Sequence, residues 1–179
     1  MSTVIPWEKG NIFGPKTAMT SKGEVLGRLI KSAKKPLMIV GAKILEDQIG
    51  GKSLLNYIVE LSKAASIPVV ATAHTLKYLV ENSLKTSVAM GIVEVTDRLR
   101  DPNWSLDGKG SYDLVVFAGI TYQLQSQMLS TLKHFAVHIK TISLDRYYSP
   151  NADYSFPNLD EKSWTDDLGR LMKTVKPER

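Results

Sequence analysis

Short apolar runs alternate along the chain with stretches of helical periodicity. Apolar runs bounded by turn residues or charges cover 35–42, 69–72, 114–119 and 139–144. A continuous apolar run of this length, rich in β-branched residues, is typical of a strand buried on both faces. Such strands belong to parallel sheets covered by helices, and ligands bind at their carboxyl ends. The run at 35–42, entered through a proline and left through Gly41, is the strand around which we expect the rest to be organised.

Amphipathic helices are predicted between these strands. The clearest one follows Ser53, the expected N-cap, and its apolar residues recur every three or four positions up to Ala65. Before the first strand, Ser21 and Glu24 have the spacing of a capping box, which predicts a helix with Ser21 as its N-cap. Further helices are expected over 74–83, over 92–99, from Thr121 onward with Leu124, Met128, Leu132 and Phe135 on one face, and over 160–175.

The remaining segments carry turn residues and no periodicity. They are an extended N-terminal arm over 1–19, a short break over 88–91 and irregular connections over 101–113 and 149–158. Strands and helices alternate elsewhere, without an internal repeat or a low-complexity linker. This alternation predicts a three-layer, doubly wound α/β fold, with a parallel sheet and right-handed crossovers, in one domain over 20–179.

Large apolar side chains are unusual in an extended arm, and this arm carries Trp7, Ile12 and Phe13. Terminal segments stay ordered only when something ties them down. We expect these three residues to pack either onto the body of the protein or onto a partner, and the sequence leaves both open.

Composition narrows the chemistry that the chain can perform. The chain has 179 residues, 43% of them hydrophobic and 23% charged, which suits one globular domain with a substantial core. Its net charge is +5, but the cations are scattered, and the densest group, 31–35, is expected at the end of a helix. We therefore do not expect a nucleic-acid partner.

The sequence has no cysteine, which excludes disulfides, thiolate nucleophiles and cysteine-ligated iron–sulfur or zinc sites in this chain.

The chain has no segment suited to a membrane. No apolar stretch approaches the roughly 20 residues that a spanning helix needs. The first residues lack the apolar core of a signal peptide. We expect a cytoplasmic protein without a membrane partner.

The segment Gly50-Gly-Lys-Ser53 has the last residues of a phosphate-binding P-loop. That motif needs another glycine five residues before Gly51, so that the backbone can curl around the phosphates. The position holds Glu46, whose carboxylate would repel phosphate. We therefore interpret Gly50-Gly51 as a turn and Ser53 as an N-cap.

Small or polar residues stand at the carboxyl ends of the predicted strands, where a nucleotide could approach the backbone and the next helix. A Gly-x-Gly-x-x-Gly fingerprint is absent from the sequence. The alternative is that a sheet simply needs small residues where its strands turn into helices. The candidate cofactor-binding residues are Gly41, Ala42, Thr72, His74, Gly119, Thr121 and Asp145.

No catalytic residue can be assigned. His74 is the one histidine placed at a predicted strand end, whereas His134 and His138 lie near a predicted helix end and are expected to be structural or solvated. Asp166 and Asp167 are expected on a helix surface. No Ser/His/Asp set and no metal-ligand spacing can be assembled from the sequence.

Several segments together resemble one protein family. The most specific are Asp101-Pro-Asn-Trp104 and the Asn-Ala-x-x-Ser-Phe pattern that ends at Phe156. The likeness covers most of the chain and extends to Leu106–Asp113, the tail Leu144–Leu159, Lys35–Gly41, Ala65–Thr72 and the Gly14-Pro-Lys of the arm. These segments resemble the epsilon subunit of the archaeal acetyl-CoA decarbonylase/synthase (carbon monoxide dehydrogenase) complex.

The resemblance implies a Rossmann-like fold similar to the FAD- or NAD-binding middle domain of thiamine-diphosphate enzymes. It also implies a partner, the alpha subunit, in an alpha2epsilon2 assembly that interconverts carbon monoxide and carbon dioxide within acetyl-CoA synthesis and cleavage. The nickel and iron–sulfur clusters are expected on that partner. For this chain the resemblance implies a non-catalytic accessory role, either stabilising the alpha subunit or assisting electron transfer to FAD.

The residues agree with this, because a chain without cysteine cannot hold the clusters that carbon monoxide oxidation needs. We therefore expect no activity from the isolated chain. The alternative function is a stand-alone electron-transfer protein that binds FAD or NAD over Gly41, Thr72 and Gly119. Whether the chain also pairs with itself is left open by the sequence.

Overall fold

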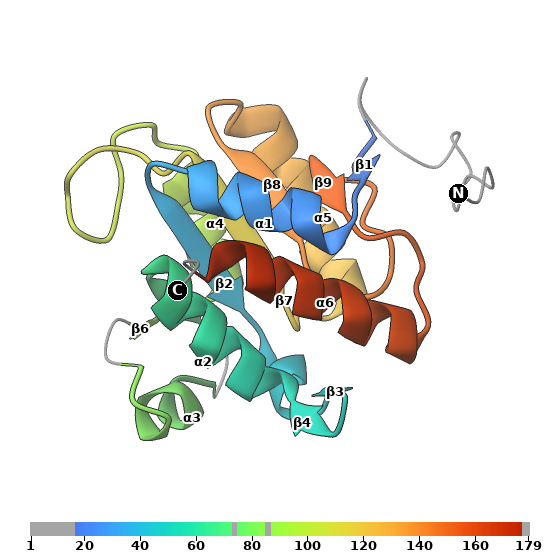
Figure 1. The fold of residues 1–179 in the computed structure, drawn as a ribbon. Helices are drawn as coiled ribbons and strands as arrows, with labels where there is room; N and C mark the ends of the chain where they lie inside the picture. The colour runs from blue at the N-terminus through green and yellow to red at the C-terminus, as the bar shows by residue number, and fades with distance from the viewer. Residues whose placement is uncertain (1–16, 73–74, 85–86, 177–179) are drawn as a thin grey trace.

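A computed structural model describes residues 17–72, 75–84 and 87–176 (Figure 1). Its centre is a seven-stranded sheet in the order β1-β9-β8-β7-β2-β5-β6, and all neighbouring strands run parallel. The strands are β1 (Met19–Thr20), β2 (Pro36–Val40), β5 (Val69–Ala71), β6 (Ser87–Ala89), β7 (Leu114–Ala118), β8 (Lys140–Ser143) and β9 (Tyr154–Ser155). A separate antiparallel hairpin joins β3 (Gln48–Ile49) to β4 (Lys52–Ser53).

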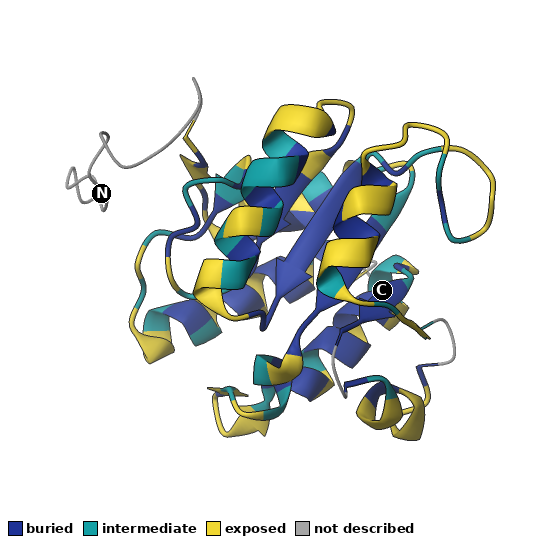
Figure 2. Ribbon diagram, turned by 180° about the vertical axis from the view of Figure 1, so that it is seen from behind, coloured by how far each residue is buried: buried dark blue, intermediate teal, exposed yellow. Residues whose placement is uncertain are grey.

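Helices cover both faces of this sheet, as Figures 1 and 2 show from opposite sides. Alternate residues of β2 enter different cores: Met38 and Val40 pack in a cluster with α1, α2 and α6, and Leu37 and Ile39 pack in a cluster with α4 and α5. The helical elements are α1 (Gly23–Ser32), the 3-10 turn η2 (Ala42–Leu45), α2 (Leu54–Ala65), α3 (Thr75–Glu81), α4 (Ile92–Leu99), α5 (Tyr122–Phe135) and α6 (Glu161–Val175). The fold is the predicted three-layer α/β fold and is Rossmann-like.

The strand order places a topological switch at the middle of the sheet. From β2 the chain proceeds outward to β5 and β6, and then returns to the other side of β2 with β7, β8 and β9. In open α/β sheets, a ligand crevice forms where the order reverses in this way, outside the carboxyl ends of the strands. Here that point lies between β2 and β7, and Gly41 and Gly119 directly follow these two strands.

The short outer strands β1, β9 and β6 are not predicted from the sequence. The predicted break at 88–91 overlaps β6, and the irregular connection at 149–158 contains β9. The last residue of the predicted arm, Met19, belongs to β1 and pairs with Tyr154. Strands of two or three residues are too short to show any periodicity, so only their neighbours in space define them. Trp7, Ile12 and Phe13 lie outside the described residues.

The start of α1 corrects two predictions. Lys22, not Ser21, is the N-cap and makes no side-chain cap, and the Gly23 N–H instead donates to Asp167 Oδ1 of α6 at 3.1 Å. Asp167 was expected on a solvated surface, but it is half-buried. α1 and α6 pack closely because Gly23 and Gly27 lack side chains: a Cβ on Gly23 would lie 1.8 Å from the Asp167 carbonyl oxygen.

The other helix predictions are confirmed, with one exception in side-chain direction. The Ser53 hydroxyl accepts a hydrogen bond from the Leu55 N–H at 3.2 Å, as an N-cap should, and Gly50-Gly51 forms the turn of the β3–β4 hairpin. Phe135 was expected on the buried face of α5, but its side chain is exposed, because Gln125, Leu129 and Leu132 form that face. Among the described helices, none is long and apolar enough to cross a membrane.

Candidate functional site

The switch point between β2 and β7 is filled by the chain itself. Gly41 and Gly119 approach each other so closely that a Cβ on Gly41 would lie 2.4 Å from the Gly119 carbonyl oxygen. Gly119 has a φ of +64°, and a Cβ there would lie 2.4 Å from Cγ2 of Ile44. Ile44, in η2, is fully buried. The two glycines therefore allow η2 to close over the end of β7.

The backbone amides at this point already have partners within the chain. Gly41 N–H donates to the Ala118 carbonyl at 3.0 Å, and Lys43 N–H donates to the Gly119 carbonyl at 3.0 Å. Gly119 N–H donates to Asp145 Oδ1 at 2.8 Å. Free amides at such a place would favour a phosphate group. These three amides are therefore not available to a phosphate.

The remaining candidate residues divide into buried and exposed positions. Thr72 is buried, and its hydroxyl donates to the Val40 carbonyl at 2.8 Å, a bond that ties the end of β5 to β2. Ala42 and Thr121 are exposed in the turns after β2 and β7. His74 lies outside the described residues. The structure thus brings Gly41, Gly119 and Asp145 together, and Asp145 also lines a cavity.

That cavity is a cleft of about 420 Å³ beside the filled switch point. Four segments form it: the turn from η2 to β3, the turn from β7 to α5, the segment after β8, and the first turns of α6. It is lined by Lys43, Glu46, Asp47, Gln48, Ile120, Tyr122, Asp145, Arg146, Tyr147, Glu161 and Trp164. Its volume is in the range of small-molecule sites.

The charges of the cleft are mixed and more acidic than basic. Burial raises the pKa of Asp145 to about 6, although hydrogen bonds from Gly119 and Gln125 partly oppose the shift. The Asp47 pKa is also raised by burial, opposed by the nearby charges of Lys43 and Arg146. An uncharged or cationic group would meet less opposition in this cleft than an anion would.

Aromatic side chains give the cleft its apolar surface. Trp164 is buried, and its indole N–H donates to the Leu144 carbonyl at 2.8 Å, which fixes the ring against the end of β8. Tyr122 is 43% exposed and Tyr147 48% exposed, so both rings remain accessible. The Arg146 guanidinium lies 4.7 Å from the centre of the Tyr147 ring. The lining residues, all within the described part of the chain, include no serine, threonine or histidine.

Asp145 is the one residue of this cleft among the candidates predicted from the sequence. Most of the lining stands in turns, which carry no periodic signal. Two weak signals were present: the carboxylates Glu46 and Asp47 follow the first long strand, and Tyr122 opens a helix.

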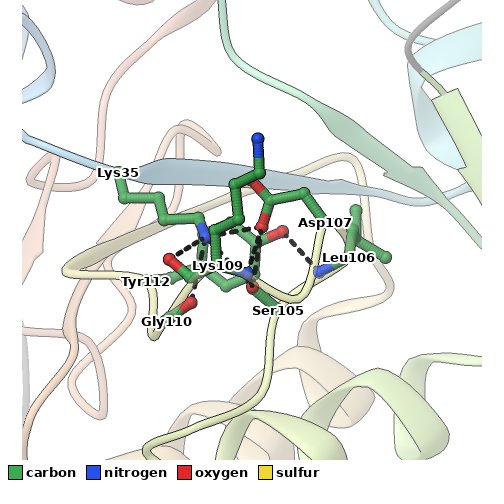
Figure 3. Close-up of polar contacts among 7 residues, drawn as sticks. All are labelled: Lys35, Ser105, Leu106, Asp107, Lys109, Gly110 and Tyr112. Atoms are coloured by element: carbon green, nitrogen blue, oxygen red, sulfur yellow. Dashed lines mark hydrogen bonds and ion pairs between the residues drawn. The ribbon is translucent and has the colours of Figure 1, made fainter.

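A second polar cluster lies at the opposite end of the sheet, where β2 begins (Figure 3). The Lys35 ammonium reaches into the loop between α4 and β7. It donates to Asp107 Oδ1 at 2.6 Å and to Ser105 Oγ at 3.0 Å. The carbonyl oxygens of Lys109 and Gly110 lie 2.9 and 3.0 Å from it. The loop therefore wraps around an internal cation.

Further contacts make this loop a fixed structure. The Tyr112 hydroxyl accepts from the Leu106 N–H at 3.0 Å, and its ring lies 5.4 Å from the Lys35 ammonium. Hydrogen bonds from Lys35, Ser105 and the Lys109 N–H hold the pKa of Asp107 well below its usual range. This loop contains two of the segments that carry the family resemblance.

Comparisons with known proteins agree with that resemblance. Residues 1–172 match the family described as CO dehydrogenase beta subunit/acetyl-CoA synthase epsilon subunit. The chain is 43% identical over 162 residues to the acetyl-CoA decarbonylase/synthase complex subunit epsilon of Methanothermobacter thermautotrophicus, covering 90% of each chain. It is 43% identical over 157 residues to the subunit of the same name from Methanothrix soehngenii, covering 87% of this chain and 81% of the relative. A relative from Archaeoglobus fulgidus, subunit epsilon 1, is 37% identical over 146 residues, which are 80% of this chain and 76% of the relative.

Proposed function

The chain belongs to the CO dehydrogenase beta subunit/acetyl-CoA synthase epsilon subunit family, and we propose that it is a non-catalytic accessory subunit. In this proposal it docks onto the metal-bearing alpha subunit of such a complex and stabilises it. The names of the relatives support the proposal, because each relative is named as a subunit of the acetyl-CoA decarbonylase/synthase complex.

The observation that carries the proposal is the filled switch point. In a fold of this order, the crevice after the central strands is the usual ligand site. Here Gly41, Ile44 and Gly119 close it, and their neighbouring amides are bonded within the chain. The adjacent cleft offers aromatic rings, carboxylates and two cations, and its lining has no serine or histidine that could form a hydrolase-type nucleophile and base pair. Such an arrangement supports binding better than it supports a reaction.

The proposed assembly is alpha2epsilon2, and it can be tested directly. The chain and the alpha subunit would be purified separately, mixed, and passed over a size-exclusion column with light scattering. We expect one complex with two copies of each chain, and a higher melting temperature for the alpha subunit in the complex. Failure of the two chains to co-elute would contradict the proposal.

A second candidate function is binding of FAD, with a role in electron transfer. It is favoured by the strand order, which is that of dinucleotide-binding sheets, and by the accessible rings of Tyr122 and Tyr147 in the cleft. The pyrophosphate of FAD does not fit the groups at the switch point, because the amides there are bonded and Asp145 and Asp47 stand nearby. A flavin bound here would have to rest its ring system in the cleft.

The melting temperature of the chain would be measured with millimolar FAD, riboflavin or ADP. A ligand at 100 times its dissociation constant stabilises by about 2.7 kcal/mol, which a thermal scan detects easily. If the ring system is what binds, FAD and riboflavin should raise the melting temperature equally and ADP should not. No shift with either flavin, for the chain alone and in complex, would exclude this second function.

A further inference from the structure

An apolar corner protrudes where α5 ends. Phe135, the last residue of α5, is 64% exposed, and Val137 is 85% exposed, the highest value for a large apolar side chain among the described residues. Ala136 between them is fully buried. Ala136 therefore packs into the core, while the side chains of Phe135 and Val137 on either side of it face outward.

Two arginines at the end of α4 extend this corner into a strip. The Arg100 guanidinium lies 5.3 Å from the centre of the Phe135 ring, and the Arg98 guanidinium lies 5.9 Å from the centre of the Trp104 ring. α4 and α5 pack side by side on one face of the sheet. We call Arg98, Arg100, Trp104, Phe135 and Val137 the arginine–aromatic strip.

Packing within the chain does not require Phe135 or Val137, whereas Trp104 is partly buried against the core. Leu129 and Leu132 already supply the buried apolar face of α5. A polar residue in place of Phe135 or Val137 would leave the core untouched, since neither side chain is buried. Single exposed apolar residues are common. An adjacent pair beside stacked arginines instead has the composition of binding hot spots, in which tryptophan, arginine and other aromatics are enriched.

Basic side chains flank the strip on its own face of the sheet. The two helices that carry the strip, α4 and α5, have Arg98 and Lys133 in their last turns. His134, His138 and Lys140 are also exposed around the corner. Arg98 and Arg100 are balanced locally by Glu94 and Asp97. A protein surface that covers the strip would gain from an apolar pocket with carboxylates at its rim.

We propose that the arginine–aromatic strip is the surface through which this chain docks onto its protein partner, with Phe135 and Val137 entering an apolar pocket bordered by acidic side chains. The proposal rests on the proposed function and names the surface for it. A two-fold pair of this chain through the same face would bring like charges together, which disfavours a second copy as the occupant.

The test is the affinity of the full chain for the alpha subunit, measured by calorimetry or by biolayer interferometry. The double variant Phe135→Ser/Val137→Ser should weaken binding by about 30-fold or more, as expected when a hot spot is lost. The matched control is Val80→Ser/Val93→Ser, whose side chains are 53% and 54% exposed on α3 and α4. The control should bind within about threefold of the wild-type chain. Both variants should melt as the wild-type chain does, because all four side chains are exposed.

A charge reversal sharpens the test. Arg100→Glu should weaken binding more than Arg100→Ala, because a carboxylate would face the acidic rim of the pocket. If the wild-type chain binds but the double serine variant binds equally well, the strip is not the docking surface and the proposed function stands. If the wild-type chain does not bind, the proposed function itself fails. Self-association of the chain alone, abolished by the double variant, would assign the strip to a second copy and overturn the proposal.

Discussion

The two ends of the sheet differ in how they use their polar groups. At the carboxyl end, the backbone amides of Gly119 and Lys43 form hydrogen bonds within the chain, and carboxylates line the cleft beside them. At the amino end, helix C-termini gather cations, and apolar side chains stand exposed beside them. The topology explains the cations, because lysine and arginine complement the negative end of each helix dipole. The topology does not explain why the apolar side chains of Phe135 and Val137 are exposed. The feature that needs a partner therefore lies away from the usual ligand end of this fold.

Glycines with positive φ occur at both ends and allow the sharpest contrast. Gly119 has a φ of +64°, and a Cβ added there would clash with Ile44. Gly108 has a φ of +67°, and a Cβ added there would have nothing within 4 Å. Gly119→Ala adds a steric clash to the cost of the left-handed conformation. We expect it to lower the free energy of unfolding by about 3 kcal/mol or more.

Gly108→Ala is the matched control, since it has the same conformational cost without the clash. We expect a loss of about 1–2 kcal/mol. Urea denaturation of both variants measures the difference. Equal losses would mean that η2 does not seal the end of β7.

Removal of the Lys35 ammonium, which the loop between α4 and β7 surrounds, should have the next largest effect on the free energy of unfolding. Lys35→Met keeps the length of the side chain and removes the ammonium that Ser105 and Asp107 contact. Because Asp107 is half exposed, solvent weakens its ion pair with Lys35. We therefore expect the loss of stability in chemical denaturation to come mainly from the hydrogen bonds of the ammonium to Ser105 and to the carbonyls of Lys109 and Gly110. Lys109→Met serves as control and should be close to neutral, because this loop uses the backbone of Lys109. A stable Lys35→Met variant would show that the loop holds itself without the cation.

Asp145 should make the carboxyl end sensitive to pH. Its pKa is about 6 in the folded chain against an ordinary value of 3.8, so the folded state holds the proton more tightly than the unfolded state does. The contribution of Asp145 to the stability of the wild-type chain should therefore fall as the pH rises from about 4 to about 6. Asp145→Asn should be more stable by about 1–2 kcal/mol above pH 6, and this advantage should vanish towards pH 4.

Asp160 provides a control of opposite sign. It is the N-cap of α6 and accepts from the Ser163 N–H at 2.7 Å, which lowers its pKa. Asp160→Asn should remove a contribution that is present above the ordinary pKa and is lost as the pH falls below it. Melting curves at several pH values compare the two variants. A pH-independent difference for Asp145→Asn would contradict its raised pKa.

The smallest effect concerns the ion pair of the arginine–aromatic strip. Arg98 and Glu94 are both about half exposed, at 48% and 51%, and lie 2.9 Å apart. Exposed pairs four residues apart on a helix contribute about 0.3–0.5 kcal/mol. Glu94→Gln should thus barely change the melting temperature, while it leaves Arg98 beside Trp104. A loss above about 1 kcal/mol would show that the pair holds the end of α4 in place.

The sequence predicts the long elements of the fold, because their periodicity is local. Ser53 is recognisable as an N-cap because its partner, Leu55, is two residues away. The start of α1 is not predictable in this way, since its acceptor, Asp167, lies 144 residues further along the chain. The small size of Gly41 and Gly119 is visible in the sequence, but not that Gly41 makes room for Gly119 and Gly119 makes room for Ile44. The cleft combines four separate turns, so only Asp145, which ends a strong strand, could be named in advance.

The proposed docking surface places the partner at the amino end of the sheet. Hydrogen–deuterium exchange of the full chain, alone and with the alpha subunit, measures this without any substitution. We expect slower exchange in the complex over 98–104 and 133–140, around the arginine–aromatic strip, and unchanged exchange over 43–48 and 120–122. Protection confined to the segments of the cleft, with none around the strip, would contradict docking through the arginine–aromatic strip.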